Sequence, residues 1–378
     1  MSCAIRAIGP FRGPSGYDRL TREYVRGLGQ LGVQLQISPV DSWSPELPRT
    51  EDLDWFDALA ADVDPDVVVH FMMPDRCQPE PGKPNANYTM FEATRIPPRW
   101  RDLAGDFDLI IVPTESCLAA WSESGVSASK LRVCPLGVDG AFFSQPVPPL
   151  ALKDGSGRPV GRYGHRFLNV GEMRPRKNHL GLLRTWLTAT RRGDDALLIL
   201  KCPMPAFLAD DFQADLADMQ ARVGRRFDEA APVLFLDGVY TDSDMRALYR
   251  AATHYVSMSH GEGWDLPMME AAAAGLSLIA PDHSSYRSYL RRTDAEWIPA
   301  REVEVSFEGR IGREDLAYFR GLSWWQTDEA EAAAIFARII QGSPPLQPPT
   351  ERILTEYGWD QAARRLLEVL QELRSGWC

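Results

Sequence analysis

The sequence predicts an α/β protein built from two doubly wound parallel-sheet domains. Its 378 residues exceed what one hydrophobic core usually supports, which favours two domains. Continuous apolar runs, typical of buried parallel strands, alternate with amphipathic helical patterns in both halves. The clearest runs are Ala4–Ile8, Pro65–Phe71, Leu109–Thr114, Ala196–Lys201 and Val233–Leu236.

A segment rich in proline and glycine, residues 145–159, has the composition of a linker. We therefore expect an N-terminal domain at residues 1–150 and a second domain at residues 151–352. A final amphipathic helix, beginning at Trp359, lies in the remaining segment, residues 353–378.

Composition and charge exclude several classes of protein. The net charge of −11 argues against a nucleic-acid partner and against more than peripheral contact with a membrane. The six cysteines show no C-x-x-C spacing, so neither a zinc site nor a disulfide framework is expected. The chain opens directly on a strand pattern, and no apolar run is long enough to span a membrane. We expect a cytoplasmic protein.

Residues 259–275 combine a strand end, a glycine-rich turn and a short helix. Pro267 fits the start of that helix, Ala271–Ala274 propagate it, and Gly275 suits its end. A helix that follows a glycine loop presents free amide groups, which favour an anion such as a phosphate. Glu262 precedes this helix and Glu270 lies in its first turns, so both can border one pocket.

A basic turn, residues 172–179, separates the predicted strand Arg166–Gly171 from a predicted helix at residues 180–191. Its cations are Arg174, Arg176 and Lys177. Cations before a helix N-terminus are unfavourable unless an anion lies among them, so the turn predicts a bound diphosphate. A solvated basic loop is the alternative, and spacing does not decide which arginine faces inward.

Both stretches resemble the retaining glycosyltransferases of family four, which have the GT-B fold. The family pattern runs approximately Ser-x-x-Glu-Gly-(Phe/Trp)-Gly-Leu-Pro-x-x-Glu, and Ser259–Glu270 matches it nearly throughout. Asp265 departs from the usual glycine, which leaves the identity of the donor sugar open. The resemblance implies two Rossmann-like domains that face a cleft, with the last helix crossing back to the first domain.

The resemblance also implies roles for individual residues. Lys177 and Arg174, or Arg176 in its place, would stabilise the leaving diphosphate as catalytic residues. Glu262, also catalytic, would bind sugar hydroxyls. The donor-binding residues would be Gly13, Ser15, Gly16, Val239, Gly263, Trp264, Asp265, Leu266 and Glu270, and the acceptor-binding residues would be Tyr17 and Glu92.

Two further departures concern positions that many family members use. Glu172 stands where arginine is common, and Phe91-Glu92 stands where many members have a histidine. No metal is expected, because the resemblance implies that cations and helix amides neutralise the diphosphate. The scattered Asp-x-Asp pairs, such as Asp106/Asp108, look like solvated charge.

The expected function is transfer of a hexosyl group, such as mannosyl, with retention of configuration. The donor would be a GDP- or UDP-linked sugar, and the acceptor a hydroxyl of a glycan, a lipid-linked sugar or a small molecule. This chemistry belongs to polysaccharide or glycoconjugate biosynthesis and needs no cofactor. Two alternatives remain open: a catalytically silent nucleotide-sugar-binding protein, and a sugar phosphorylase or epimerase on the same scaffold.

Overall fold

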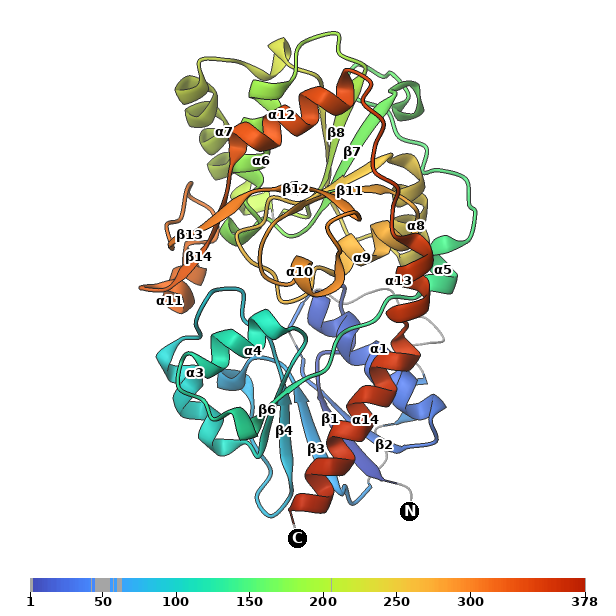
Figure 1. Cartoon of the computed structure of the whole chain (residues 1–378), viewed down its shortest axis with the longest axis vertical. Helices are drawn as coiled ribbons and strands as arrows, with labels where there is room; N and C mark the ends of the chain where they lie inside the picture. Colours follow the sequence, from blue (N-terminus) through green and yellow to red (C-terminus); the bar gives the residue numbers. More distant parts are fainter. Residues whose placement is uncertain are drawn as a thin grey trace. The chain divides into compact units, whose positions relative to one another are not determined.

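The computed structural model describes residues 3–41, 43–44, 55–56, 58–59, 63–204 and 206–377. The chain divides into a first unit, Met1–Asp139 with Thr355–Cys378, and a second unit, Gly140–Leu354 (Figure 1). This division falls before the boundary expected at residue 150. Within the described residues, each unit contains a six-stranded sheet whose recorded strand pairings are all parallel. The two expected parallel-sheet α/β domains are therefore confirmed.

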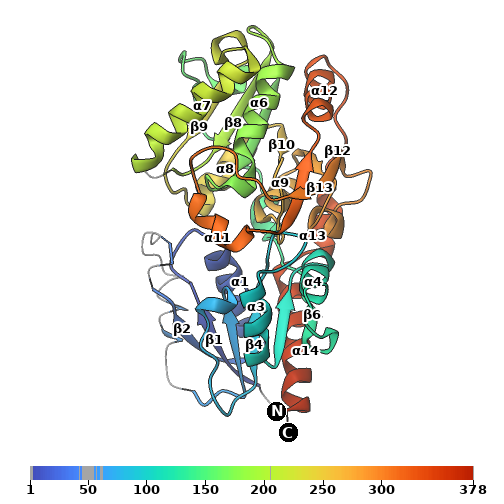
Figure 2. The ribbon, with the colours of Figure 1, turned by 90° about the vertical axis from the view of Figure 1, so that its left-hand side faces the viewer.

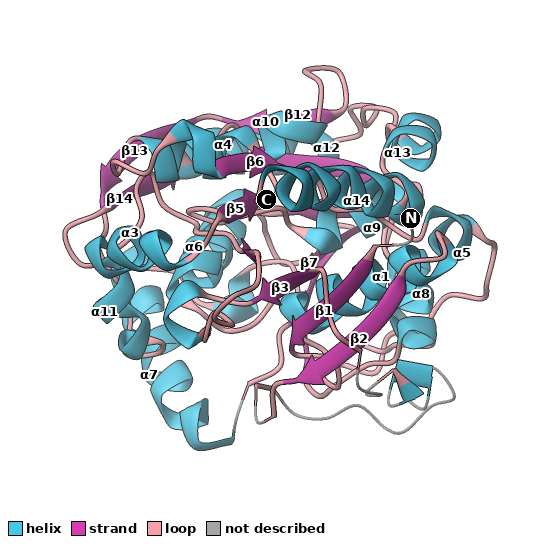
Figure 3. Ribbon diagram, turned by 90° about the horizontal axis from the view of Figure 1, so that it is seen from below, coloured by secondary structure: helices cyan, strands magenta, loops and turns pink. Residues whose placement is uncertain are grey.

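The first unit has the strand order β2-β1-β3-β4-β5-β6, with β1 and β2 side by side (Figure 3). The order reverses between β1 and β3, and ligands of open α/β sheets bind beyond the carboxyl ends of strands at such a point. Its elements are β1 (Ala4–Gly9), α1 (Gly16–Gln30), β2 (Gln34–Pro39), β3 (Val67–Phe71), β4 (Asn85–Tyr88), α3 (Pro98–Leu103), β5 (Leu109–Val112), α4 (Glu115–Ser122), β6 (Leu131–Val133) and α14 (Trp359–Gly376).

The last helix, α14, belongs to the first unit although the segment before it belongs to the second. It lies beside α1, as Figure 1 shows in red and blue. The approach is close at Gly27 of α1, where an added Cβ would lie 2.5 Å from the Cβ of Ala363. The rings of Tyr24 and Trp359 meet edge to face with centroids 5.6 Å apart. The expected return of the chain to the first domain is thus confirmed.

The second unit has the strand order β12-β11-β10-β7-β8-β9. Taken from β9, this is the 3-2-1-4-5-6 order of the Rossmann fold, which reverses between β7 and β10. Its strands are β7 (His165–Val170), β8 (Ala196–Lys201), β9 (Val233–Leu236), β10 (His254–Val256), β11 (Ser277–Pro281) and β12 (Ala295–Ile298). Its helices are α5 (Gly140–Ser144), α6 (His179–Ala189), α7 (Ala209–Val223), α8 (Asp242–Ala251), α9 (Leu266–Ala273), α10 (Tyr286–Tyr289), α11 (Leu316–Phe319) and α12 (Glu329–Ile340), and α13 (Thr350–Glu356) spans the joint between units.

Helices α6 and α7 lie side by side next to β8 (Figure 2). The core between sheet and helices contains Phe167 of β7, Trp186 of α6 and Phe336 of α12, whose ring centroids are 5.3 to 5.9 Å apart. The indole of Trp186 donates to the carbonyl oxygen of Ala231 at 2.9 Å. Because these large side chains are fully buried, they hold β7 and its neighbours in a defined position.

An antiparallel hairpin, β13 (Ala300–Glu304) with β14 (Ser323–Thr327), follows the second sheet. Neither of these strands was predicted from the sequence. Trp324 and Trp325 lie on β14, and Trp324 is almost completely buried. The hairpin therefore packs these indoles onto the rest of the unit instead of extending the parallel sheet.

Candidate functional site

The loops that follow β7 and β10 come together at the point where the strand order of the second sheet reverses. Strands β7 and β10 are paired, with Phe167 opposite His254 and Leu168 opposite Tyr255. The loop after β7 ends in a short 3-10 turn, η5 (Pro175–Lys177), and the loop after β10 carries Glu262. The topology thus brings both sequence-predicted stretches to one edge of the sheet.

Glu262 forms an ion pair with each of two cations in η5. Its Oε1 lies 2.7 Å from the Nζ of Lys177, and its Oε2 lies 2.8 Å from the Nη1 of Arg176. Arg176 also donates to the carbonyl oxygen of Gly261 at 2.7 Å, and the amide of His260 donates to the carbonyl oxygen of Arg176 at 2.8 Å. The two loops are therefore joined by both side chains and backbone.

Charge at this cluster favours the ionised form of Glu262. Burial alone would raise the pKa of Glu262, but Arg176 and Lys177 outweigh it and lower that pKa to about 2. The hydroxyl of Ser259 adds a hydrogen bond to Oε1 at 2.5 Å. Two cations and one carboxylate leave the cluster with a net charge of +1, which suits an anionic ligand.

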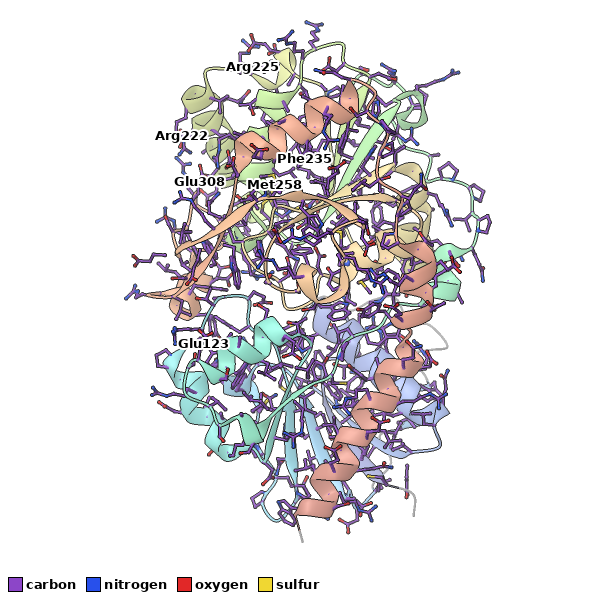
Figure 4. All side chains as sticks on the ribbon, in the orientation of Figure 1. Glu123, Arg222, Arg225, Phe235, Met258 and Glu308 are labelled. Atoms are coloured by element: carbon purple, nitrogen blue, oxygen red, sulfur yellow. The ribbon has the colours of Figure 1, made fainter. Side chains whose placement is uncertain are left out.

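Asn178 connects this cluster to helix α6. It has a left-handed backbone with φ 54°, and its Oδ1 accepts from the amide of Gly181 at 3.2 Å, which caps the helix. Its Nδ2 donates to the carbonyl oxygen of Met258 at 3.0 Å. Met258, labelled in Figure 4, lies in the segment after β10. One side chain thereby ties the basic turn to the neighbouring loop.

Helix α9 begins at Leu266, and Pro267 is its second residue. The N-cap is Asp265, whose backbone is left-handed with φ 73° and whose Oδ1 lies 3.4 Å from the amide of Met268. A positive φ is the conformation that glycine adopts most readily, which accounts physically for the glycine of the family pattern at this position. The helix ends before Gly275, which has φ 85°, as the sequence predicted.

The carboxylate of Asp265 turns toward the interior of the unit. Its Oδ2 accepts a hydrogen bond from the hydroxyl of Tyr286 at 2.8 Å, and Tyr286 in turn pairs with the hydroxyl of Ser257 at 2.7 Å. Burial, followed by the charge of Glu262, raises the pKa of Asp265 to about 7. Trp264, immediately before it, is buried and packs on Tyr289 with ring centroids 5.0 Å apart.

Glu270 lies farther along α9 and is also buried. Its Oε2 accepts from the hydroxyl of Tyr249 in α8 at 2.7 Å. Glu262 thus pairs with two cations, and Glu270 accepts a hydrogen bond from a tyrosine hydroxyl.

Two histidines, neither of them predicted from the sequence to have a role, support the loop that carries Glu262. His260 stacks on Trp324 with ring centroids 4.3 Å apart, and His283 stacks on Trp325 at 5.0 Å. Burial lowers the pKa of His260 to about 4 and that of His283 to about 3, so both are neutral at pH 7. The ring of His283 is also held by a hydrogen bond between its Nε2 and the carbonyl oxygen of Ser259, which are 2.8 Å apart.

Arg174 does not reach Glu262. Its Nη1 lies 2.5 Å from Glu314 and 3.4 Å from Asp315, and its Nε lies 3.7 Å from Glu172. The structure therefore places Arg176, rather than Arg174, in the cluster with Lys177.

Val239 follows the end of β9 and is half exposed. Beside it, the carbonyl oxygen of Gly238 accepts from the Nζ of Lys201, a buried lysine at the end of β8, at 2.7 Å. Lys201 also lies over the ring of Tyr240, 4.6 Å from its centroid. Lys201 was not among the site residues predicted from the sequence.

The remaining predicted residues belong to the first unit. Ser15 caps α1, and its hydroxyl donates to the Oδ2 of Asp18 at 2.5 Å. The amides of Gly13 and Ser15 donate to the same carboxylate at 2.7 and 3.2 Å. The carboxylate of Asp18 therefore occupies the position in which these two amides would bind a phosphate. Gly16 is the first residue of α1.

Tyr17 and Glu92, the predicted acceptor-binding residues, lie near one another in the first unit. The hydroxyl of Tyr17 pairs with that of Thr89 at 3.2 Å and accepts from the amide of Met90 at 3.3 Å. Burial, with a smaller contribution from the charge of Glu92, raises the pKa of Tyr17 above its usual value.

Over the described part of the chain, no group of three or more histidine, cysteine, aspartate or glutamate side chains is arranged to hold a metal ion. None of the helices in the same ranges combines the length and the hydropathy of a membrane-spanning segment. The cysteines Cys3, Cys77, Cys117, Cys134 and Cys202 are free.

The second unit matches a known family. Residues 164–309 fit the family model described as Glycosyl transferases group 1, and this segment contains the whole cluster around Glu262. Over this segment the second unit is similar to that family. No curated protein matches the chain.

Solved structures of low sequence identity share the fold over nearly the whole chain. HepE of Anabaena, in complex with UDP and glucose, has a TM-score of 0.67 at 11% identity, covering 98% of this chain and 100% of HepE. Sucrose-phosphate synthase of Thermosynechococcus elongatus has a TM-score of 0.63 at 12% identity, covering 99% and 100%. A glycosyltransferase of Rickettsia africae has a TM-score of 0.63 at 13% identity, covering 98% of each chain. These likenesses confirm the GT-B fold.

Proposed function

We propose that this protein is a retaining glycosyltransferase that moves a hexosyl group from a nucleoside-diphosphate sugar to an acceptor hydroxyl. The observation that carries the proposal is the cluster of Lys177, Arg176 and Glu262 beside the loop that opens helix α9. It lies at the strand-order reversal where parallel α/β sheets bind ligands, inside the segment that matches the glycosyltransferase family.

Breaking a sugar–phosphate bond places negative charge on the leaving diphosphate and positive charge on the anomeric carbon. Lys177 and Arg176, which are fixed in advance by Glu262, then stabilise the diphosphate at little cost in reorganisation. The amides at the start of α9 add to this stabilisation. In this proposal Glu262 also binds sugar hydroxyls and Glu270 holds the ribose, as the resemblance of Ser259–Glu270 to the family implies.

The donor is UDP- or GDP-linked, and the HepE structure with UDP-glucose supports testing UDP-glucose first. The acceptor is the hydroxyl of a glycan, of a lipid-linked sugar or of a small molecule, held by Tyr17 and Glu92. Gly13, Ser15 and Gly16 approach the donor, and Val239 receives the base. Retention of configuration and independence of metal rest on the resemblance of Ser259–Glu270 to the retaining family.

Lys177→Ala tests the proposal through hydrolysis of the donor. Loss of one preorganised charge from a water-poor site should lower turnover by about 10²-fold or more. Lys153→Ala removes an exposed lysine of the same unit and serves as the matched control, for which wild-type turnover is expected. Equal turnover of the two variants would contradict the role of Lys177.

Product analysis separates the alternatives. Donor binding without release of nucleoside diphosphate, for any acceptor, would identify a silent nucleotide-sugar binder. Sugar exchange that depends on inorganic phosphate would identify a phosphorylase, and interconversion of the donor sugar itself would identify an epimerase. The proposed transferase instead gives a new glycoside with the anomeric configuration of the donor, which nuclear magnetic resonance of the product detects.

A further inference from the structure

Asp265 places a carboxylate at the N-terminus of helix α9. Its backbone has a φ of 73°, a conformation that glycine would adopt with less strain, and its side chain is almost fully buried. The carboxylate lies 3.4 Å from the amide of Met268, one of the groups that a bound anion would meet at the start of α9. An internal anion and an incoming diphosphate therefore compete for the same positive helix end.

The groups around Asp265 come from four elements. Glu262, in the same loop, repels its charge, and Lys177 in η5 attracts it. Tyr286 in α10 donates to its Oδ2 at 2.8 Å, which favours the charged form. Tyr255 in β10 is near enough that the Asp265 charge raises the pKa of its hydroxyl, after burial, which is the larger cause. Arg176 acts on this set through Glu262, its ion-pair partner.

We propose that Asp265 couples the binding of a diphosphate to the uptake of a proton by its own carboxyl in part of the molecules. This inference rests on the proposed function, because it requires a nucleoside diphosphate group in front of α9. The neutral carboxyl no longer repels the diphosphate, and it keeps its contact with Tyr286.

The direction of the pH effect follows from linkage. Binding a second anion nearby raises the pKa of Asp265 above its value of about 7 in the free protein. Donor affinity is therefore highest when Asp265 is protonated, and it declines as the pH rises through 7. If binding raises that pKa by one unit, affinity falls by about tenfold in total over this range.

The test is calorimetry with UDP-glucose and GDP-mannose at pH 7.5, in buffers of different ionisation enthalpy. The diphosphate of each probe is a diester with no proton that titrates near neutral pH, so proton uptake reports on the protein. With a pKa rise of about one unit, the wild type should take up about half a proton per site. Asp265→Asn tolerates the left-handed backbone and retains a side-chain acceptor, and it should bind with no uptake and with an affinity independent of pH from 6.5 to 8.5.

Tyr286→Phe is the second variant. It removes a hydrogen bond that favours the charged form, so the decline in affinity should move to higher pH while binding persists. Binding by the wild type without proton uptake, or with the same uptake in Asp265→Asn, overturns the coupling and leaves the proposed function intact. Failure of the wild type to bind either probe counts against the proposed function itself.

Discussion

Arg174 and Arg176 differ in what they face, although only one residue separates them. Arg176 and Lys177 share the carboxylate of Glu262, whereas Arg174 pairs with Glu314 and Asp315. Spacing could not make this distinction, because the partner of Arg174 is supplied by a segment 140 residues later in the chain. The basic turn was predictable from the sequence, but the direction of each cation in it was not.

Arg176→Ala is expected to lower donor turnover by at least about tenfold, since it removes one of two charges from the site. Arg174→Ala removes an arginine next to it in the same turn. It should lower turnover less, because the Arg174 guanidinium is paired with the exposed carboxylate of Glu314. Steady-state kinetics of donor hydrolysis measures both variants. A larger loss for Arg174→Ala than for Arg176→Ala would show that the two assignments are reversed.

The departure at Asp265 illustrates a second limit of sequence reasoning at the residue scale. Replacement of the usual glycine was visible in the sequence, and a side chain bordering the donor sugar was the expectation. In the structure this carboxylate accepts a hydrogen bond from the hydroxyl of Tyr286, and whether it borders the sugar stays a prediction. Neither the positive φ nor the contact with Tyr286, on a later helix, can be derived from the motif alone.

At the scale of elements, the joint between η5 and α6 sets the position of the cations. Asn178 supplies the left-handed residue, the helix cap and the bond to Met258. Three functions in one residue make this joint sensitive to substitution.

Asn178→Ala should therefore destabilise the protein by about 2–3 kcal/mol, because it loses the cap and strains the backbone. Asn178→Gly loses the same side-chain bonds but adopts the positive φ freely, so it should cost about 1 kcal/mol less. Urea denaturation compares the two. Equal stabilities would indicate that the left-handed backbone at residue 178 carries no strain.

Strands with continuous apolar runs were well predicted, and β8 and β9 have the expected ends, Ala196–Lys201 and Val233–Leu236. Burial on both faces gives such strands a signal that does not depend on distant partners. The β13–β14 hairpin was not predicted, because its position depends on contacts that are distant in the sequence. Trp324 stacks on His260, and Trp325 stacks on His283.

At the scale of the whole molecule, the chain leaves the first unit after Asp139 and returns to it at Thr355. The C-terminal helix therefore contributes to the core of the N-terminal unit. The close approach of α14 to α1 at Gly27 provides a test of this arrangement.

Gly27→Ala places a methyl group 2.5 Å from the Cβ of Ala363 and should destabilise the first unit by about 1–3 kcal/mol. Ala363→Gly removes the opposing methyl group. Gly27→Ala should therefore lower the stability much less in the Ala363→Gly variant than in the wild type. Thermal unfolding of the four proteins completes the cycle. Additive effects would show that these two positions are not in contact.

The order of strands in each sheet was not predictable from the sequence, although the alternation of strands and helices was. That order decides which loops meet, and in the second unit it joins the loops after β7 and β10. The sequence motifs thus indicated the chemistry, and the topology explains why residues 176–177 and 262 meet.

A crystal structure of the protein with a bound nucleoside diphosphate would show which groups hold the phosphates. We expect phosphate oxygens within hydrogen-bond distance of the Nζ of Lys177 and of backbone amides at the start of α9. A nucleotide whose phosphates contact neither Lys177 nor the N-terminus of α9 would contradict it.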